Sequence, residues 1–283
     1  MIALMLCIGA LPFLNNARLY ASEGASEAEL QKQENKWLDD YHAHVGLTYG
    51  VKASLNAIYL WRGLNCGGLN IQADANVGYG GLYFDMWWNI GTTDWAFTHF
   101  QPEVDLSLGF RRWGLDVRMI YIHCFNSGFF DFTNYPDHGN HLELDVRYTV
   151  SSKLPLSFLW ATRVAAADGY LEEQGQVVRA WSSYAELSYK HRFVYDISLY
   201  GAIGITPWRS LYTGYQRGFA VQNIELRLRK DWSLSAHCGM MLQGTFAINP
   251  SALAADRSSA EWHPANPYGQ SINTNITLGF YLK

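Results

Sequence analysis

The feature that most constrains the fold is a strict two-residue alternation in the first quarter of the chain. Between Tyr41 and Trp61 every odd position is apolar, whereas the even positions from His42 to Asn56 are His, Gly, Thr, Lys, Ser or Asn. Successive side chains of a β-strand point to opposite faces, and a helix would need apolar residues three and four positions apart. The stretch therefore predicts one long strand with an apolar face and a polar face.

The same alternation recurs along the rest of the chain and predicts about twelve strands in an all-β fold. The other predicted strands are Leu69–Tyr79, Leu82–Ile90, Pro102–Phe110, Leu115–Tyr121, Leu142–Tyr148, Leu154–Ala166, Arg179–Lys190, Val194–Thr206, Phe219–Lys230, Leu234–Asn249 and Ile272–Leu282. Their connections alternate between short turns, such as Gly80-Gly81 and His191-Arg192, and longer loops, such as residues 126–140 and 250–270. Short periplasmic turns and longer extracellular loops are typical of outer-membrane barrels.

The strands of a soluble β-sandwich also alternate apolar and polar residues, so the distribution of charge has to distinguish it from a membrane barrel. The apolar faces of the first six predicted strands and of the last contain no Asp, Glu, Lys or Arg, and only 16% of all residues are charged, against about 25% in soluble domains. A charge at mid-bilayer costs ~2–4 kcal/mol, so an outer face in lipid excludes it. Aromatic residues near strand ends fit two interfacial girdles: Tyr79, Phe110, Tyr148, Tyr189, Trp232 and Phe280 beside the turns, and Trp61, Trp88, Tyr121 and Trp160 toward the loops.

These observations predict a transmembrane antiparallel β-barrel over residues 41–283, located in the bacterial outer membrane. The apolar segment 1–21 is interpreted as a signal peptide with a cut after Ala21, the alternative being a buried N-terminal strand. Residues 22–40 are polar and are interpreted as a periplasmic tether. The net charge of −4 and the absence of a basic patch give no indication of nucleic-acid binding.

The polar faces of the strands carry the candidate functional residues. The side chains expected to line the lumen are Arg62, Asp74, Asp85, Glu103, Asp105, Asp116, Arg118, Glu143, Asp145, Arg147, Arg163, Glu186, Glu225 and Arg227. Such charges can set the ion or solute preference of a conduit. They can also pair into a network that fills the lumen, because isolated charges in a narrow interior are costly.

Enzymatic and metal-binding roles find less support. Residues His123, Asn126, Ser127 and His141 stand near strand ends, where outer-membrane lipid hydrolases place their groups, but no nucleophile-with-base spacing is present. The segment Asp137–His141 offers two histidines without an evident third metal ligand. A Cys66–Cys124 disulfide would have to join non-adjacent strands. We therefore expect no enzyme activity, no cofactor and no metal.

Short motifs in the first part of the chain resemble the TorF-type family of bacterial outer-membrane porins. The motifs are Tyr59–Leu64, Gln72, Gly80–Tyr83 and Glu103–Leu106, and the resemblance is clearest over Val45–Phe125. It implies an outer-membrane barrel that conducts small solutes.

We accordingly expect a porin-like channel for passive diffusion of small polar solutes, with lipids and solutes or ions as its partners. The alternative is a closed barrel that serves as a scaffold or subunit beside other outer-membrane proteins. An inward fold of residues 126–140 or 250–270 would favour that alternative. A lipid hydrolase is a third possibility.

Overall fold

The computed structural model describes residues 47–92, 100–125, 128–132, 140–151, 153–166, 168–171, 175–215, 218–253 and 271–282. The chain divides into a unit of residues 1–39 and a unit of residues 40–283. The predicted signal peptide (1–21) and tether (22–40) lie outside the described residues, and both remain predictions. Among the described residues, no helix is long and apolar enough to cross a membrane.

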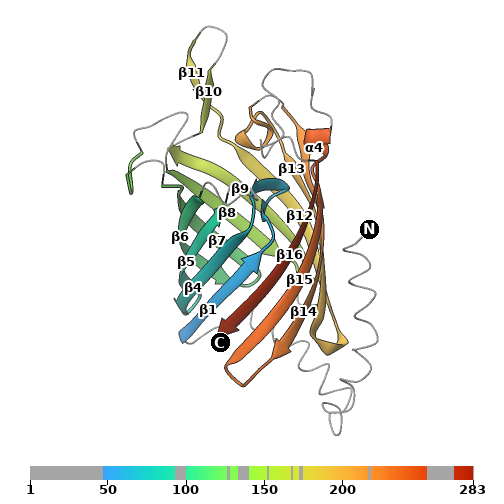
Figure 1. Cartoon of the computed structure of the whole chain (residues 1–283). Helices are drawn as coiled ribbons and strands as arrows, with labels where there is room; N and C mark the ends of the chain where they lie inside the picture. Colours follow the sequence, from blue (N-terminus) through green and yellow to red (C-terminus); the bar gives the residue numbers. More distant parts are fainter. Residues whose placement is uncertain are drawn as a thin grey trace. The chain divides into compact units, whose positions relative to one another are not determined.

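Twelve antiparallel strands close into one barrel, which confirms the predicted fold (Figure 1). Each strand pairs with its neighbour along the chain, and the first strand pairs with the last. The strands are β1 (Leu47–Asn56), β4 (Asn70–Tyr79), β5 (Leu82–Thr92), β6 (Phe100–Arg112), β7 (Leu115–His123), β8 (His141–Thr149), β9 (Leu156–Ala166), β12 (Ser183–Phe193), β13 (Ile197–Thr206), β14 (Ala220–Ser233), β15 (Cys238–Ile248) and β16 (Ile272–Leu282).

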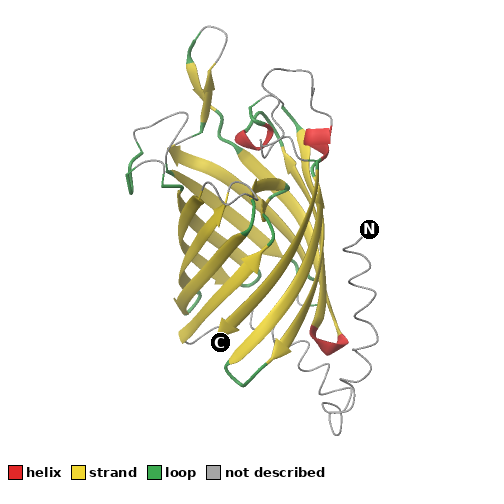
Figure 2. Cartoon of the chain, viewed as in Figure 1, coloured by secondary structure: helices red, strands yellow, loops and turns green. Residues whose placement is uncertain are grey.

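Short elements lie in the connections between these strands (Figure 2). Two hairpins each contain a pair of strands: β2 (Tyr59–Trp61) pairs with β3 (Leu64–Gly67), and β10 (Gly169–Leu171) pairs with β11 (Val177–Arg179). The helical elements are η2 (Val194–Asp196), η3 (Leu211–Thr213) and α4 (Pro250–Leu253).

The predicted alternation places apolar side chains on the outside of the barrel and polar ones inside. On β16, for example, Ile272, Ile276 and Phe280 are exposed, whereas Asn273 and Thr277 between them are buried. An exposed apolar outer surface is unfavourable in water and favourable in lipid, where a closed barrel also satisfies every backbone hydrogen bond. Closure and the apolar outer surface together place the barrel in a bacterial outer membrane.

The first predicted strand is wrong at its C-terminal end. Strand β1 ends at Asn56, and Tyr59–Trp61 belongs to the separate β2–β3 hairpin. The physical reason is visible at Ile58 and Leu60, which put apolar side chains on the face that had been polar up to Asn56. Trp61 consequently does not belong to the aromatic girdle. Residues 41–46 lie outside the part of the chain that the structure describes.

Several other strands differ from their predicted bounds. Strand β13 begins at Ile197 instead of Val194, because Val194–Asp196 forms η2. Strand β14 runs on to Ser233 instead of Lys230, so the turn comes later and β15 begins at Cys238 instead of Leu234. Strand β12 begins at Ser183 instead of Arg179, because Arg179 pairs with Gly169 in the β10–β11 hairpin. The same strand runs on through the predicted turn at His191-Arg192, because the ladder to β13 continues to the pair Phe193–Ile197.

In the described residues a tyrosine ring lies over a glycine at three places on the inner wall, Gly109, Gly204 and Gly239, and the first of these contacts leads to a stability prediction. A Cβ atom on Gly109 would lie 2.4 Å from the ring of its cross-strand partner Tyr83, and Gly239 stands in the same relation to Tyr281. We expect Gly109→Ala to lower the free energy of unfolding in lipid vesicles by about 1–3 kcal/mol, because the ring must move aside. Gly244→Ala, where nothing lies within 4 Å, is the matched control. Equal effects of the two substitutions on urea unfolding would contradict the prediction.

Candidate functional site

The β2–β3 hairpin is the most distinctive feature of the barrel interior. It connects β1 to β4, and its tip is formed by Arg62 and Gly63, which both have positive φ angles of 48° and 80°. Two such residues make the tight turn whose twist matches a two-stranded ribbon. A Cβ atom on Gly63 would lie 2.4 Å from the carbonyl oxygen of Gln222 on β14, so the tip packs closely against that wall.

Arg62 binds two carboxylates on β8. Its Nη1 and Nη2 atoms donate to the two carboxylate oxygens of Glu143 at 2.9 and 2.7 Å, and Nη2 also lies 3.4 Å from Asp145. The Arg62 side chain is 9% exposed and that of Glu143 only 1% exposed. A bidentate, charge-assisted pair of this kind is among the strongest polar contacts in proteins. It fixes the hairpin tip to the opposite wall.

Three aromatic rings surround the same guanidinium group. Its carbon lies 4.7 Å from the ring centroid of Trp61, 4.9 Å from that of Tyr184 and 5.6 Å from that of Tyr212. The hydroxyl group of Tyr212 contacts Arg62 and donates to Glu143 at 3.2 Å. Cations over aromatic faces are stabilised electrostatically, more so when water is excluded.

The pKa of Arg62 follows from these contacts. Burial alone would lower it, but the carboxylate of Glu143 and the other neighbours raise it, and the result is a pKa well above that of a free guanidinium. Arg62 is therefore charged at every pH at which the barrel would work.

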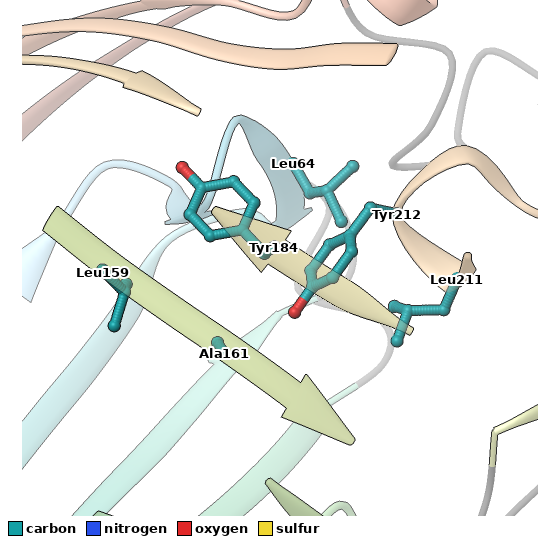
Figure 3. Packing of buried hydrophobic residues seen from close by; sticks show 6 residues of the cluster. All are labelled: Leu64, Leu159, Ala161, Tyr184, Leu211 and Tyr212. Atoms are coloured by element: carbon teal, nitrogen blue, oxygen red, sulfur yellow. The ribbon is translucent and has the colours of Figure 1, made fainter. Parts of the chain in front are cut away.

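A second loop joins the hairpin inside the barrel. The buried side chains of Leu64, Leu159, Ala161, Tyr184, Leu211 and Tyr212 form one cluster, which Figure 3 shows between the hairpin, η3 and the walls β9 and β12. The backbone N–H of Leu211 donates to the hydroxyl oxygen of Ser182 at 2.8 Å, and the backbone N–H of Ser182 donates to Asp168 at 2.8 Å. These bonds hold the η3 loop to the chain between β9 and β12, and Leu211 and Tyr212 of that loop pack against Leu64 of the hairpin.

The hairpin is also held on its remaining sides. The hydroxyl group of Tyr59 donates to Glu103 on β6 at 3.1 Å. On β16, Asn275 accepts from the backbone N–H of Ile58 at 3.1 Å, and Asn273 donates to the carbonyl oxygen of Gly63 at 3.4 Å. Contacts with β6, β8, β14 and β16 mean that the hairpin reaches across the lumen. We call residues 57–69 the crossing hairpin.

The structure places the predicted lumen residues in two settings. Arg62 lies at the tip of the crossing hairpin, not on the wall, whereas the other thirteen lie at inward positions of the strands. Several of them are brought into contact: Arg118 pairs with Asp145 at 2.8 Å, Arg227 pairs with Glu225, and Glu186 accepts from the hydroxyl groups of Tyr184 and Tyr200 at 2.7 and 2.6 Å. Their role in solute passage remains a prediction.

Sequence reasoning missed several residues of the interior. Arg111 and Arg192 were assigned to turns, yet each continues the inward alternation of its strand, and Arg111 pairs with Asp116 at 2.7 Å. The inward place of Arg192 could have been predicted, because it continues the polar even positions Glu186, Ser188 and Lys190 of its strand. Tyr212 had no signal, because nothing in its loop indicates an inward fold.

The residues weighed for catalysis or metal binding do not form a site in the described part of the chain. His123 lies on the outer side of β7, contacts Asn140, stacks against the ring of Tyr121 and meets the ring of Phe129 edge-on. Asn126, Ser127 and residues 137–139 lie outside the described residues. Cys66, Cys124 and Cys238 are free thiols.

Comparisons with known proteins give structural likeness only. No protein-family model and no curated protein sequence matches the chain. The NanC porin is 11% identical, with a TM-score of 0.44, over 83% of this chain and 100% of that one. The COG4313 outer membrane channel from Pseudomonas putida F1 is 11% identical, with a TM-score of 0.44, over 86% of this chain and 97% of that one. The CymD monoaromatic hydrocarbon channel is 10% identical, with a TM-score of 0.39, over 91% of this chain and 92% of that one.

Proposed function

We propose that the chain is a porin-like channel of the bacterial outer membrane, through which small polar solutes diffuse passively. The observation that carries the proposal is the inner wall, where ionisable side chains such as Asp74, Arg118 and Glu186 occupy inward positions on most strands. Buried charges stabilise a fold poorly compared with apolar packing. A charged interior is therefore better explained by contact with water and solutes. The resemblance to the TorF-type porin family belongs to the same proposal.

The crossing hairpin sets the width of the path through this channel. In an eight-stranded barrel the side chains fill the interior, whereas a sixteen-stranded porin has an open channel. A barrel of twelve strands encloses an intermediate space. A hairpin fixed across such a lumen narrows the path on the extracellular side. Passage of a solute then goes past Arg62 and the side chains that hold it.

A planar lipid bilayer tests the proposal. The purified barrel is inserted, and single-channel current is recorded in a salt gradient. Discrete current steps with a defined reversal potential are expected. A silent bilayer, with folding confirmed by heat-dependent migration in electrophoresis, would contradict the channel.

A closed barrel acting as a scaffold is the second candidate, and a specific observation favours it. The crossing hairpin and the η3 loop pack inside the barrel through a buried apolar cluster. Residues 126–140 and 250–270, whose inward fold would favour the closed barrel, lie largely outside the described residues. A silent but folded barrel that co-purifies with another outer-membrane protein would support this candidate.

Charge reversal on the inner wall should change ion preference. Arg147 faces Asp116 across β7 and β8, and Arg118 is 35% exposed beside Asp145. We expect Arg147→Glu or Arg118→Glu to raise the ratio of cation to anion permeability by roughly a factor of two or more, because a positive charge at the path becomes negative. Reversal potentials in a KCl gradient measure this ratio. Lys153→Glu, in an exposed turn, is the control, and equal potentials for all variants would exclude Arg118 and Arg147 from the path.

A further inference from the structure

The charges of the inner wall are ordered along the barrel axis. Strands β6, β8, β12 and β14 all run from an extracellular loop to a periplasmic turn. On β6, β8 and β12 the inward acidic residues come first and the inward basic residues follow, and on β14 the same order is followed by one more carboxylate, that of Asp231, which pairs with Arg229. The acidic residues are Glu103, Asp105, Glu143, Asp145, Glu186 and Glu225, and the basic ones are Arg111, Arg147, Lys190, Arg192, Arg227 and Arg229.

The extracellular part of the lumen is consequently acidic. In the described residues, this part of the lumen also holds two guanidinium groups, those of Arg62 at the hairpin tip and Arg163 opposite Glu143, while Asp145 and Glu225 pair in addition with Arg118 and Arg227. Carboxylates are neighbours on the inner face of each of two strands, Glu103 and Asp105 on β6 and Glu143 and Asp145 on β8. We call this part the acidic zone.

The periplasmic part of the lumen is basic. Lys52 on β1 and Arg118 on β7 add to the six basic residues of the four strands, against the carboxylates of Asp74, Asp85, Asp116 and Asp231 and that of Asp196 in η2, which pairs with Arg192. Lys190 and Arg227 lie on either side of Tyr200 in the strand register, and Arg192 and Arg229 lie on either side of Ser198, so basic groups of β12 and β14 face one another across β13. We call this part the basic zone. The pairs Arg118–Asp145 and Arg227–Glu225 mark the boundary between the two zones.

Two zones of opposite sign in series oppose the passage of any simple ion. A cation is attracted by the acidic zone and repelled by the basic zone. An anion is repelled by the acidic zone and attracted by the basic zone. A solute that carries one cationic and one anionic group has no net charge, so neither zone excludes it. At the boundary its ammonium group can face the acidic zone while its carboxylate or sulfonate group faces the basic zone.

We propose that the solutes selected by this lumen are small zwitterions, molecules that carry an ammonium group together with a carboxylate or sulfonate group. The inference rests on the proposed channel function and names its solute class. The two charged zones discriminate by the presence of both charges on one molecule, not by size.

Matched probes test this selection in proteoliposomes. Taurine and isethionate differ only in an ammonium group that is replaced by a hydroxyl group, and glycine betaine and choline differ only at the carboxylate. We expect each zwitterion to leave liposomes roughly five- to tenfold faster than its matched ion, the factor for about one uncompensated unit charge at short range in water. Equal efflux of zwitterions and ions would overturn the inference and leave the channel intact. Efflux of every probe at the rate of protein-free liposomes would overturn both.

Variants of each zone provide a second readout. Lys190→Gln together with Arg229→Gln neutralises part of the basic zone. This double variant should raise the efflux rate of choline and leave the efflux of isethionate slow. Glu186→Gln together with Glu225→Gln neutralises part of the acidic zone. This double variant should raise the efflux rate of isethionate and leave the efflux of choline slow. Lys153→Gln removes a positive charge from an exposed turn and serves as the control. If each double variant changes the efflux rates of choline and isethionate by the same factor, the two zones do not act separately and the inference is wrong.

Discussion

Replacing Arg62 by alanine is expected to increase single-channel conductance at least about twofold, because the crossing hairpin loses its attachment to β8. Arg62 donates two hydrogen bonds to Glu143 in a setting almost closed to water. Loss of about 3 kcal/mol of such contact would raise the ratio of displaced to docked hairpin by roughly a hundredfold. Conductance in a planar bilayer, together with the fraction of time spent in the larger state, measures the change.

Two further variants identify the cause of that change. Arg62→Lys retains the charge but not the bidentate geometry, so its conductance should lie between those of the wild type and the alanine variant. Arg112→Ala removes an arginine that stacks on Trp113 at the periplasmic end of β6, away from the hairpin, and should leave conductance unchanged. If Arg62→Ala conducts like the wild type, the hairpin does not control the path.

A positive charge on the outer face should destabilise the barrel in proportion to its depth. Leu226 lies midway along β14, is 51% exposed and stands between the inward residues Glu225 and Arg227. Leu226→Arg is expected to lower the free energy of unfolding by ~2–4 kcal/mol, because the guanidinium group enters the middle of the lipid layer. Urea titration of the barrel in lipid vesicles measures this value.

The matched control is the same substitution at the edge of the apolar surface. Leu47→Arg, at the periplasmic start of β1, should change the free energy of unfolding by only about 0–1 kcal/mol, since the side chain reaches water at the interface. Equal losses at Leu47 and Leu226 would show that the outer face does not cross a lipid layer.

The barrel itself could be predicted because its two faces meet different surroundings along the whole of each strand. Lipid outside and polar groups inside impose a period of two, which Ile272–Leu282 shows without a break. The alternation of short and long connections then sets which end faces the periplasm. Neither step needs information about distant residues.

The crossing hairpin could not be predicted in the same way. Tyr59 and Trp61 continue the apolar odd positions of the first strand, and the alternation alone cannot distinguish lipid from a cluster inside the lumen. The break at Ile58 and Leu60 marks where the strand ends but not where the chain goes. Arg62 was expected on the wall at the end of the first strand, and its place at the hairpin tip had no local signal, because its partner Glu143 lies 81 positions away.

Closure of the barrel has a consequence for how the molecule is made. The hydrogen bond between Thr277 and Asn56 joins β16 to β1 across 221 positions of the chain, and the seam between these strands consists of contacts of this range. Contacts between such distant residues form slowly, and until they form both outer strands present open edges that pair with other chains. The chain is therefore exposed to aggregation from its synthesis until its last strand arrives, and its biogenesis depends on a holding chaperone more than that of a helical protein of equal length.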